Sequence, residues 1–202
     1  MRVLLATTNK GKVLELKRIL GERGIEIVDL DVSATTEEIE VGSTFAENAL
    51  LKARYYHRHS GLPTIADDSG LEVEALGGAP GIASARYGGA GATDAERTAK
   101  LLAELKDVPP ENRAARFVCA AAIAWSGGEQ VFTEKVRGVV LSEPRGRDGF
   151  GYDPVFYYDP LGKTFAELTP AEKSEVSHRG RAFYRLAGWL DESGLLEAAG
   201  ER

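Results

Sequence analysis

The first thirty residues constrain the fold of this 202-residue chain more than any other stretch. An apolar run at residues 3–6 has the length of a buried strand, and a second apolar run follows at residues 25–30. The segment between them carries apolar residues at helical spacing, and these are Val13, Leu16, Ile19 and Leu20. A strand, a helix and a strand in this order predict a βαβ unit whose two strands are parallel.

The second half of the chain follows a different pattern. Residues 116–125 and 130–141 read as two long strands joined by Ser-Gly-Gly-Glu at 126–129, which predicts an antiparallel hairpin. Helices are expected at residues 45–60, from 93 to about 106, and near the C-terminus. Parallel units followed by a hairpin predict an α/β fold with a mixed sheet and flanking helices. We expect one domain over residues 1–202, with a second lobe mainly at about 110–160 and an active-site cleft between the lobes.

Composition excludes several classes of function. The net charge of −6 argues against sequence-independent binding to nucleic acid, which requires a basic face. A single cysteine, Cys119, excludes an internal disulfide and a cysteine-based metal cluster. No segment has the pattern of a targeting signal or a membrane span, so we expect a cytoplasmic protein without a membrane partner.

Two adjacent carboxylates, Asp67 and Asp68, follow the short apolar run at residues 62–66. If that run is a strand, the carboxylates lie at its end, where ligands collect in open α/β sheets. Neighbouring carboxylates repel one another, so a cation or a hydrogen-bond network is expected to hold them. The alternative is a solvated turn at residues 67–70, because Asp, Ser and Gly are ordinary turn residues. The alternation at residues 71–75 predicts a further, half-buried strand.

Polar residues at 7–12 form a second candidate site. Two threonines, an amide and two lysines stand before the expected helix at 13–20, where backbone N–H groups and the helix dipole favour an anion. This stretch predicts a phosphate-binding loop, with an ordinary capped helix start as the alternative. The expected helix at 45–60 leaves Asn48 and Lys52 near the edge of its buried face. The loop before it carries Glu37, Glu38 and Glu40.

A third candidate site combines an aromatic turn with basic residues. The glycines on both sides of Phe150 allow backbone to approach a flat ligand, so that Phe150 or Tyr152 stacks on a base. The alternative is a tight turn with both aromatic side chains in the core. Lys173, His178 and Arg179 lie on successive short elements and could converge on an anion or on a purine edge.

Six motifs together resemble the family of noncanonical purine nucleoside triphosphate pyrophosphatases. The motifs are TTNKGK at 7–12, TFAENA at 44–49, ADDSGL at 66–71, GAPG with SARY at 78–81 and 84–87, GFGYDP at 149–154, and EKS with SHRG at 172–174 and 177–180. They occur in the family's order from residue 3 to about 190. No motif position departs from the family pattern, although some members carry a second acidic residue where this chain has Val41.

The resemblance implies a homodimer of elongated α/β subunits that hydrolyses ITP, dITP or XTP to a monophosphate and pyrophosphate with Mg²⁺. It implies that Asp68 is the general base, that Asp68 and Glu40 contact the metal, and that Asp67 tunes the charge of Asp68. The implied substrate-binding residues are Thr7, Thr8, Asn9, Lys10, Gly11, Lys12, Lys52 and Ser69 near the phosphates, and Phe150, Gly151, Tyr152, Asp153, Lys173, His178 and Arg179 near the base. Two alternatives remain open, a pyrophosphatase for other modified or standard NTPs and a nucleotide-binding sensor without catalysis.

Overall fold

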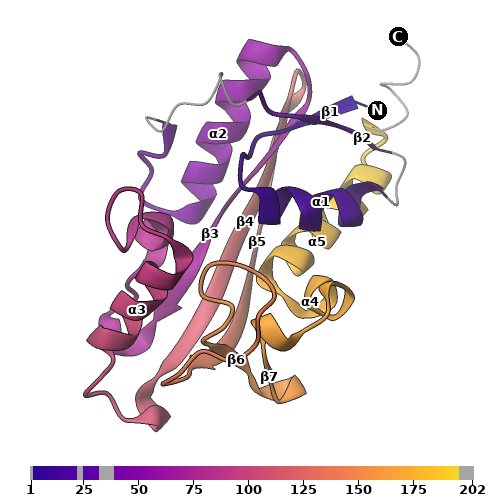
Figure 1. Cartoon of the computed structure of the whole chain (residues 1–202). Coiled ribbons are helices and arrows are strands. Elements are labelled where there is room, and N and C mark those ends of the chain that lie inside the picture. The colour runs from indigo at the N-terminus through magenta and orange to yellow at the C-terminus, as the bar shows by residue number, and fades with distance from the viewer. Residues whose placement is uncertain (1, 22–24, 32–38, 196–202) are drawn as a thin grey trace. The chain divides into compact units, whose positions relative to one another are not determined.

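A computed structural model describes residues 2–21, 25–31 and 39–195. Within these residues, the strands form one sheet in the order β2-β1-β3-β4-β5-β6-β7. The strands are β1 (Arg2–Leu5), β2 (Glu26–Asp29), β3 (Thr64–Val73), β4 (Ala114–Trp125), β5 (Gly128–Val140), β6 (Phe156–Tyr158) and β7 (Lys163–Thr164). The α-helices are α1 (Lys10–Gly21), α2 (Phe45–Ser60), α3 (Asp94–Glu104), α4 (Pro170–Val176) and α5 (His178–Glu192), drawn in Figure 1. The expected mixed sheet with flanking helices is confirmed.

The chain divides into two compact units, each with its own hydrophobic core. Unit 1 comprises Met1–Asp68, Cys119–Glu134 and His178–Arg202, and unit 2 comprises Ser69–Val118 and Lys135–Ser177. Strands β3, β4 and β5 each contribute residues to both units. The lobe expected at about 110–160 shares residues 110–118 and 135–160 with unit 2, whereas residues 119–134 belong to unit 1.

The βαβ unit at the N-terminus is confirmed in unit 1. Strand β1 pairs in parallel with β2 and also with β3, where Leu5 stands opposite Ile65. Helices α1 and α5 pack against each other, and both contribute to the core of this unit (Figure 1). Alternate residues of β4, namely Cys119, Ala121 and Ile123, belong to the same core. One face of the sheet in unit 1 is therefore covered by α1 and α5.

The intervening residues of β4 point to the opposite face, because side chains alternate along a strand. These residues are three alanines, Ala120, Ala122 and Ala124, and all are buried. Helix α2 contacts β1 and buries its own small residues, Ala49 and Ala53. Thr44 caps this helix by accepting from the Glu47 amide, and Gly61 ends it in the left-handed conformation, so its bounds agree with the prediction. We infer that α2 covers the second face of the sheet in unit 1.

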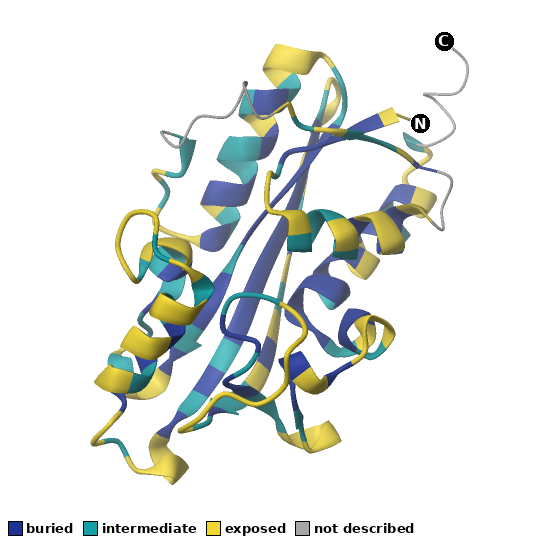
Figure 2. Ribbon diagram, in the orientation of Figure 1, coloured by how far each residue is buried: buried dark blue, intermediate teal, exposed yellow. Residues whose placement is uncertain are grey.

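Unit 2 has an aromatic core. The rings of Phe117, Phe156 and Phe165 lie within 6 Å of one another, as their centroid distances of 4.6, 5.7 and 4.8 Å show. Because β4 and β5 are neighbours joined by two residues, they form the expected antiparallel hairpin. Strand β5 continues into antiparallel pairing with β6, and β6 with β7. Figure 2 shows that β3 and β4 are buried along most of their length.

Two local predictions were wrong. The Asp-Asp-Ser-Gly segment is neither a strand end nor a turn, because residues 64–73 form one continuous strand. The helix expected at 13–20 begins earlier, so Lys10, Gly11 and Lys12 form its first turn. No helix in the described part of the chain combines the length and the apolar character that a membrane crossing requires.

Candidate functional site

Asp67 and Asp68 lie in the middle of β3 but just past the end of its neighbour β1. Strand β1 ends at Leu5, opposite Ile65, and the Ala6 amide donates to the Ile65 carbonyl at 2.8 Å. Because side chains alternate along a strand, Asp67 shares the face of Ile65, which belongs to the core beneath α1 and α5. Asp68 points to the face of α2. The two carboxylates therefore occupy opposite faces of the sheet.

Asp67 is buried in a network of charged side chains. Lys12 Nζ lies 2.8 Å from Asp67 Oδ2, and Arg179 Nε lies 3.6 Å from the same oxygen. Arg179 also pairs with Glu15 through Nη1 at 2.7 Å. Burial by itself would raise the pKa of Asp67, but the charges of Lys12, Arg179 and Lys52 outweigh it and hold the pKa well below its usual range. Asp67 is therefore a permanently ionised residue, already balanced by cations.

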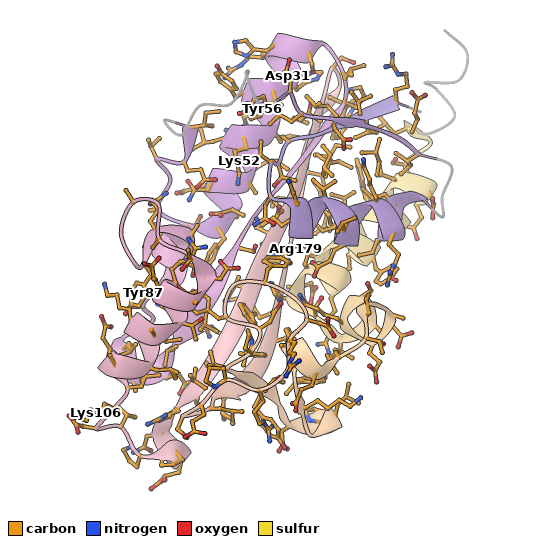
Figure 3. The ribbon with its side chains drawn as sticks, in the orientation of Figure 1. Asp31, Lys52, Tyr56, Tyr87, Lys106 and Arg179 are labelled. Carbon is orange, nitrogen blue, oxygen red and sulfur yellow. The ribbon has the colours of Figure 1, made fainter. Side chains whose placement is uncertain are left out.

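Asp68 has a different environment, although it is also buried. The Asn48 amide donates to Asp68 Oδ2 at 3.0 Å, and the Gly42 amide donates to Asn48 Oδ1 at 2.7 Å. Lys52 projects from α2 and pairs with Glu40 at 2.8 Å, whereas Arg179 lies at the start of α5 (Figure 3). Burial raises the pKa of Asp68, and the charge of Glu40 adds to the rise, against the opposing effect of Lys52 and Lys12. The pKa of Asp68 is therefore shifted in the opposite direction to that of Asp67.

Glu40 and Asp68 suit a hard divalent cation. Both supply carboxylate oxygens, which are the ligands that such a cation prefers, and the charge of Glu40 contributes to the raised pKa of Asp68. Mg²⁺ usually binds through one or two carboxylates, water and substrate phosphates. Among the residues that the structure places, no group of three or more acidic, histidine or cysteine side chains could hold a metal. Glu37 and Glu38 lie outside the described residues.

The start of α1 combines both readings of residues 7–12. Asn9 caps the helix, since its Oδ1 accepts from the Lys12 amide at 3.1 Å and its carbonyl accepts from the Val13 amide at 2.9 Å. Thr7 Oγ1 accepts from the Asn9 amide at 3.3 Å. Thr8, Asn9 and Lys10 are exposed, and Gly11 and Lys12 are half-buried. An exposed, capped helix start that carries the half-buried Lys12 is the kind of place where an anion can bind.

The turn at residues 149–154 gathers a second cluster within unit 2. Asp153 is buried, and its Oδ2 accepts from the Phe150 amide at 2.8 Å and from Lys173 Nζ at 2.6 Å. Lys173 Nζ also stands 4.7 Å from the centre of the Phe150 ring. A Cβ on Gly149 would collide with the Asp153 carboxylate, which explains the glycine there. Phe150 itself is only half-buried.

The motifs of both clusters belong to one known family. The sequence model described as the Ham1 family matches residues 3–189, which is most of the chain. The chain belongs to the Ham1 family.

Curated relatives and solved structures agree with this assignment. A Frankia alni protein named dITP/XTP pyrophosphatase is 52% identical over 198 residues, covering 95% of this chain and 98% of the relative. A Thermus thermophilus protein of the same name is 51% identical and covers 92% of this chain and 90% of the relative. The HAM1 protein from Coxiella burnetii matches in structure with a TM-score of 0.86 at 40% identity, over 95% and 99% of the two chains. A Mycobacterium abscessus structure described as a nucleoside-triphosphatase / dITP/XTP pyrophosphatase matches with a TM-score of 0.74 at 48% identity, over 92% and 98%.

This Ham1 chain brings some predicted site residues together and separates others. Lys12, Lys52 and Asp68 share one charged environment in unit 1, and Phe150, Asp153 and Lys173 share another in unit 2. Arg179, predicted beside the base, contacts Asp67 and Glu15, and His178 is buried next to it at the start of α5. Ser69 continues β3 directly after Asp68, and Gly151 lies in the turn at 149–154.

Tyr152 belongs to the core, which agrees with the alternative reading of the aromatic turn. Its side chain is 4% exposed, and its hydroxyl donates to the Ser84 carbonyl at 2.9 Å. Burial raises its pKa to about 12, so it remains a neutral hydroxyl at ordinary pH. Of the two aromatic residues in the turn, Phe150 is the one that is only half-buried.

Glu15 is a member of the Asp67 network that sequence analysis missed. A glutamate on a surface helix is ordinary, and nothing local marks it. The available signal is its spacing, because Glu15 follows Lys12 by three residues and so lies beside it on the same face of α1.

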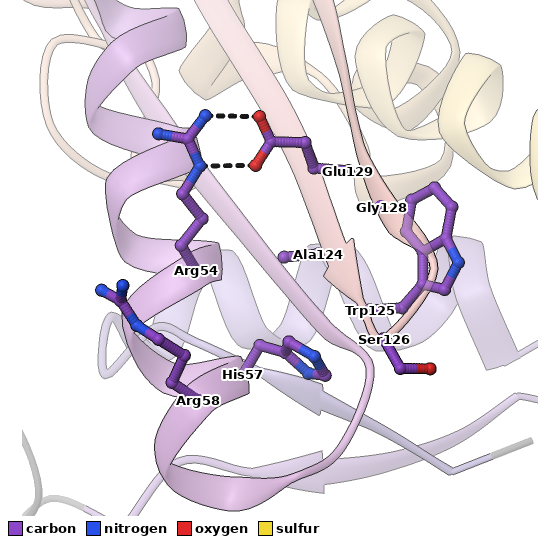
Figure 4. Close-up of a pocket in the computed structure, with 8 residues that line it drawn as sticks. All are labelled: Arg54, His57, Arg58, Ala124, Trp125, Ser126, Gly128 and Glu129. Carbon is purple, nitrogen blue, oxygen red and sulfur yellow. Dashed lines mark hydrogen bonds and ion pairs between the residues drawn. The ribbon is translucent and has the colours of Figure 1, made fainter.

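A hollow of about 360 Å³ lies elsewhere on unit 1, at the end of the hairpin (Figure 4). Its lining comprises Arg54, His57, Arg58, Ala124, Trp125, Ser126, Gly128 and Glu129. Arg54 and Glu129 pair through two hydrogen bonds across it. None of the predicted site residues lines this hollow.

Proposed function

We propose that this chain hydrolyses noncanonical purine nucleoside triphosphates (ITP, dITP and XTP) to the nucleoside monophosphate and pyrophosphate. The observation that carries the proposal is the environment of Asp68, a buried carboxylate oriented by Asn48 and flanked by Lys52 and Glu40. Ham1 relatives half identical to this chain carry the name dITP/XTP pyrophosphatase, which supports the choice of substrate. In this role the enzyme removes damaged nucleotides from the precursor pool.

Asp68 would act as the general base on the attacking water. A carboxylate with a raised pKa accepts a proton more effectively at neutral pH than an ordinary aspartate does. The Asn48 amide donates to one oxygen of Asp68 and so orients the carboxylate. Asp67 is less suited to this task, because the neighbouring cations lower its pKa and make it a weaker proton acceptor, and because it points to the other face of the sheet.

Lysines would neutralise the triphosphate. The pKa of Lys52 is raised, since the charges of Asp67, Asp68 and Glu40 outweigh the opposing effect of burial, so Lys52 remains a cation. Lys12 and the exposed start of α1, with Asn9 and Ser69, complete the proposed phosphate-binding set. Glu40 and Asp68 would hold Mg²⁺, whose positive charge stabilises the charge that develops on the phosphates during attack.

Phe150 and Lys173 would recognise the base. Phe150 offers a half-exposed ring for stacking, and Lys173 is a fixed donor held by Asp153. Hypoxanthine and xanthine carry an acceptor oxygen at C6, where adenine carries an amino donor. A site built to donate to that oxygen rejects adenine nucleotides by factors on the order of 10⁴. His178 and Arg179 join this set on the family resemblance.

Isotope labelling tests the reaction. The protein is incubated with ITP and Mg²⁺ in ¹⁸O-enriched water, and the products are separated and weighed by mass spectrometry. Attack at the α-phosphorus yields unlabelled pyrophosphate and IMP with one ¹⁸O atom. Label in pyrophosphate would place the attack on the β-phosphorus, and IDP with orthophosphate would reject the pyrophosphatase assignment. Binding of ITP without products would indicate a nucleotide sensor.

The family resemblance also supports a homodimer in the cytoplasm, with no nucleic acid or membrane partner. The net charge of −6 agrees with the proposal that the protein has no nucleic-acid partner. Light scattering with size-exclusion chromatography distinguishes a dimer from a monomer directly.

A further inference from the structure

Helix α3 forms hydrogen bonds to the aromatic turn of unit 2, residues 149–154. The Gly151 amide donates to Asp94 Oδ2 at 2.6 Å, and Thr98 Oγ1 donates to the Gly151 carbonyl at 3.4 Å. Asp94 and Thr98 are four residues apart, so they lie on one face of the helix. The N–H and the C=O of one glycine are therefore both bound to the same helix.

Asp94 is itself oriented. Arg97 donates to the other oxygen of the Asp94 carboxylate, and Arg97 Nη1 donates to the Ala85 carbonyl at 2.7 Å. Asp94 is the first residue of α3, where the helix dipole favours a negative charge, and the Thr93–Glu96 capping box fixes the start of this helix. The carboxylate that binds Gly151 is thus held by bonds that do not involve the turn.

The turn has little stiffness of its own. Gly149 and Gly151 both adopt positive φ, of 78° and 63°, and glycine is the residue that most readily leaves such a conformation. Two carboxylates fix the peptides on either side of the Phe150 side chain: Asp153 accepts from the Phe150 amide, and Asp94 accepts from the Gly151 amide. Because both amides are occupied, the turn can offer a ligand the ring of Phe150 but neither of these N–H donors.

We propose that Asp94 is a positioning residue for purine recognition, which fixes Gly151 so that the Phe150 ring is presented to the base. This inference rests on the proposed function. Asp94 is bonded neither to the residues proposed to bind the phosphates nor to Asp68, so its loss affects how the base is held. The effect is therefore specific to ligands that contain a base.

The test compares two ligands on one variant. Inorganic tripolyphosphate lacks a base, so its inhibition constant against ITP hydrolysis reports phosphate binding alone. In Asp94→Ala we expect the KM for ITP to rise about tenfold and kcat to change less than about threefold. A tenfold rise corresponds to part of the binding free energy that one stacked base contributes. The inhibition constant of tripolyphosphate stays within about twofold of wild type. Asp94→Asn retains an oxygen that can accept from Gly151, and it restores most of the affinity for ITP.

Glu96→Ala is the matched control. It removes the capping box at the same turn of α3 but leaves the Asp94–Gly151 bond in place, so the KM for ITP is expected to stay near wild type. Amide hydrogen exchange followed by NMR gives a readout that does not depend on activity. Gly151 should exchange faster in Asp94→Ala and not in Glu96→Ala.

The possible outcomes are distinct. If wild type does not hydrolyse ITP, the proposed function fails. If wild type is active but Asp94→Ala leaves the KM for ITP unchanged, the positioning role is overturned. It is also overturned if Asp94→Ala weakens the binding of tripolyphosphate as much as the binding of ITP. Equal effects of Asp94→Ala and Glu96→Ala would assign the loss to a frayed helix and would also overturn it. Should Asp94→Ala fail to fold, Thr98→Val removes the carbonyl bond, and a smaller rise in KM for ITP alone is expected.

Discussion

At the scale of single residues, two adjacent aspartates differ because a strand turns them to opposite faces. Asp67 meets Lys12 and Arg179 and has a depressed pKa, whereas Asp68 meets Asn48 and has a raised pKa. The proposal therefore assigns the same residue type to a countercharge on one face and to a proton acceptor on the other. The alternation of a β-strand is sufficient to produce this division of roles.

Asp68→Asn tests the role of the proton acceptor. The amide keeps the size of the side chain but cannot take a proton from water, so kcat for ITP is expected to fall by about 10³-fold or more. Binding of ITP is largely retained, because Lys12 and Lys52 remain. Single-turnover kinetics measures the first quantity, and isothermal titration calorimetry measures the second.

The control is Asp29→Asn, at an exposed strand end where Asp29 pairs with Lys17. It should leave kcat near wild type. Turnover by Asp68→Asn at a rate close to wild type, with weaker binding, would show that Asp68 holds the substrate and does not activate water.

Glu15→Gln tests the buried charge network. Arg179 is 4% exposed and pairs with Glu15, so removing the negative charge leaves a buried guanidinium with one countercharge fewer. The free energy of unfolding should fall by about 1–3 kcal/mol. Urea denaturation followed by tryptophan fluorescence measures it. Glu26→Gln breaks the exposed pair with Arg2 and is expected to cost less than about 0.5 kcal/mol, so equal losses in the two variants would contradict the role of Glu15.

Sequence patterns predicted which residues lie near the candidate site better than they predicted which residues contact one another there. Asn48 and Lys52 were placed at the edge of the buried face of α2, and the structure finds both beside Asp68. Arg179 was predicted near the base, yet it contacts Asp67. Its position depends on the packing of α5 against α1, which is a contact between segments more than 150 residues apart. No local pattern carries that information.

At the scale of elements, helices with capping boxes were predicted well and the central strand was not. Thr44 and Thr93 each cap a helix where expected, because the cap is a local interaction that sequence spacing specifies. Asp, Ser and Gly are depleted in strands, so the segment at 67–70 suggested a turn. Its strand conformation comes instead from pairing with neighbours that are distant in sequence.

Glu172→Gln tests the cap of α4, the helix that carries Lys173. The Thr169 amide donates to Glu172 at 2.7 Å and Lys163 donates at 2.9 Å, and these bonds lower the pKa of Glu172 to about 2. A carboxylate with a depressed pKa contributes stability that is complete above its ordinary pKa of about 4.3 and is lost as the pH falls towards the folded value. Wild type should therefore melt higher than Glu172→Gln at pH 6, and the difference should shrink between about pH 5 and pH 2.

Differential scanning calorimetry over this range measures the two melting temperatures. Glu175→Gln, on the same helix but outside its capping box, is the control and should show no such convergence. A difference between wild type and Glu172→Gln that stays constant with pH would mean that the charge of Glu172 does not contribute.

At the scale of the whole molecule, the candidate residues divide between two units with separate cores. Unit 1 contains Lys12, Lys52 and Asp68, and unit 2 contains Phe150, Asp153 and Lys173. The residues proposed for the phosphates therefore belong to unit 1 except Ser69, which belongs to unit 2. Of the residues proposed for the base, His178 and Arg179 belong to unit 1 and the others to unit 2. Sequence analysis predicted two lobes, but the division of residues among them follows from strands that contribute to both units, and boundaries in the middle of a strand leave no trace in composition.

The distribution of tryptophan allows the phosphate half of the proposal to be tested by itself. Both tryptophans of the chain, Trp125 and Trp189, lie in unit 1, where their rings pack 5.4 Å apart. Thermal unfolding followed by their fluorescence therefore reports unit 1.

If unit 1 holds the triphosphate, Mg²⁺ with inorganic tripolyphosphate at about 100 times its dissociation constant should stabilise unit 1 by about 2.7 kcal/mol. The reason is that a ligand that binds only the native state shifts unfolding by mass action. For a chain of this size that corresponds to roughly 5–10 °C. Wild type is the form to use, because Asp68 is one of the two proposed Mg²⁺ ligands, and a nonhydrolysable analogue of ITP serves in the parallel measurement. Omitting Mg²⁺ should remove most of the shift, because Mg²⁺ supplies part of the positive charge that the proposal uses to hold the phosphates. If the unfolding temperature seen by fluorescence does not change with tripolyphosphate but rises with the nucleotide, binding depends on the base. The assignment of Lys12 and Lys52 to the phosphates would then be wrong.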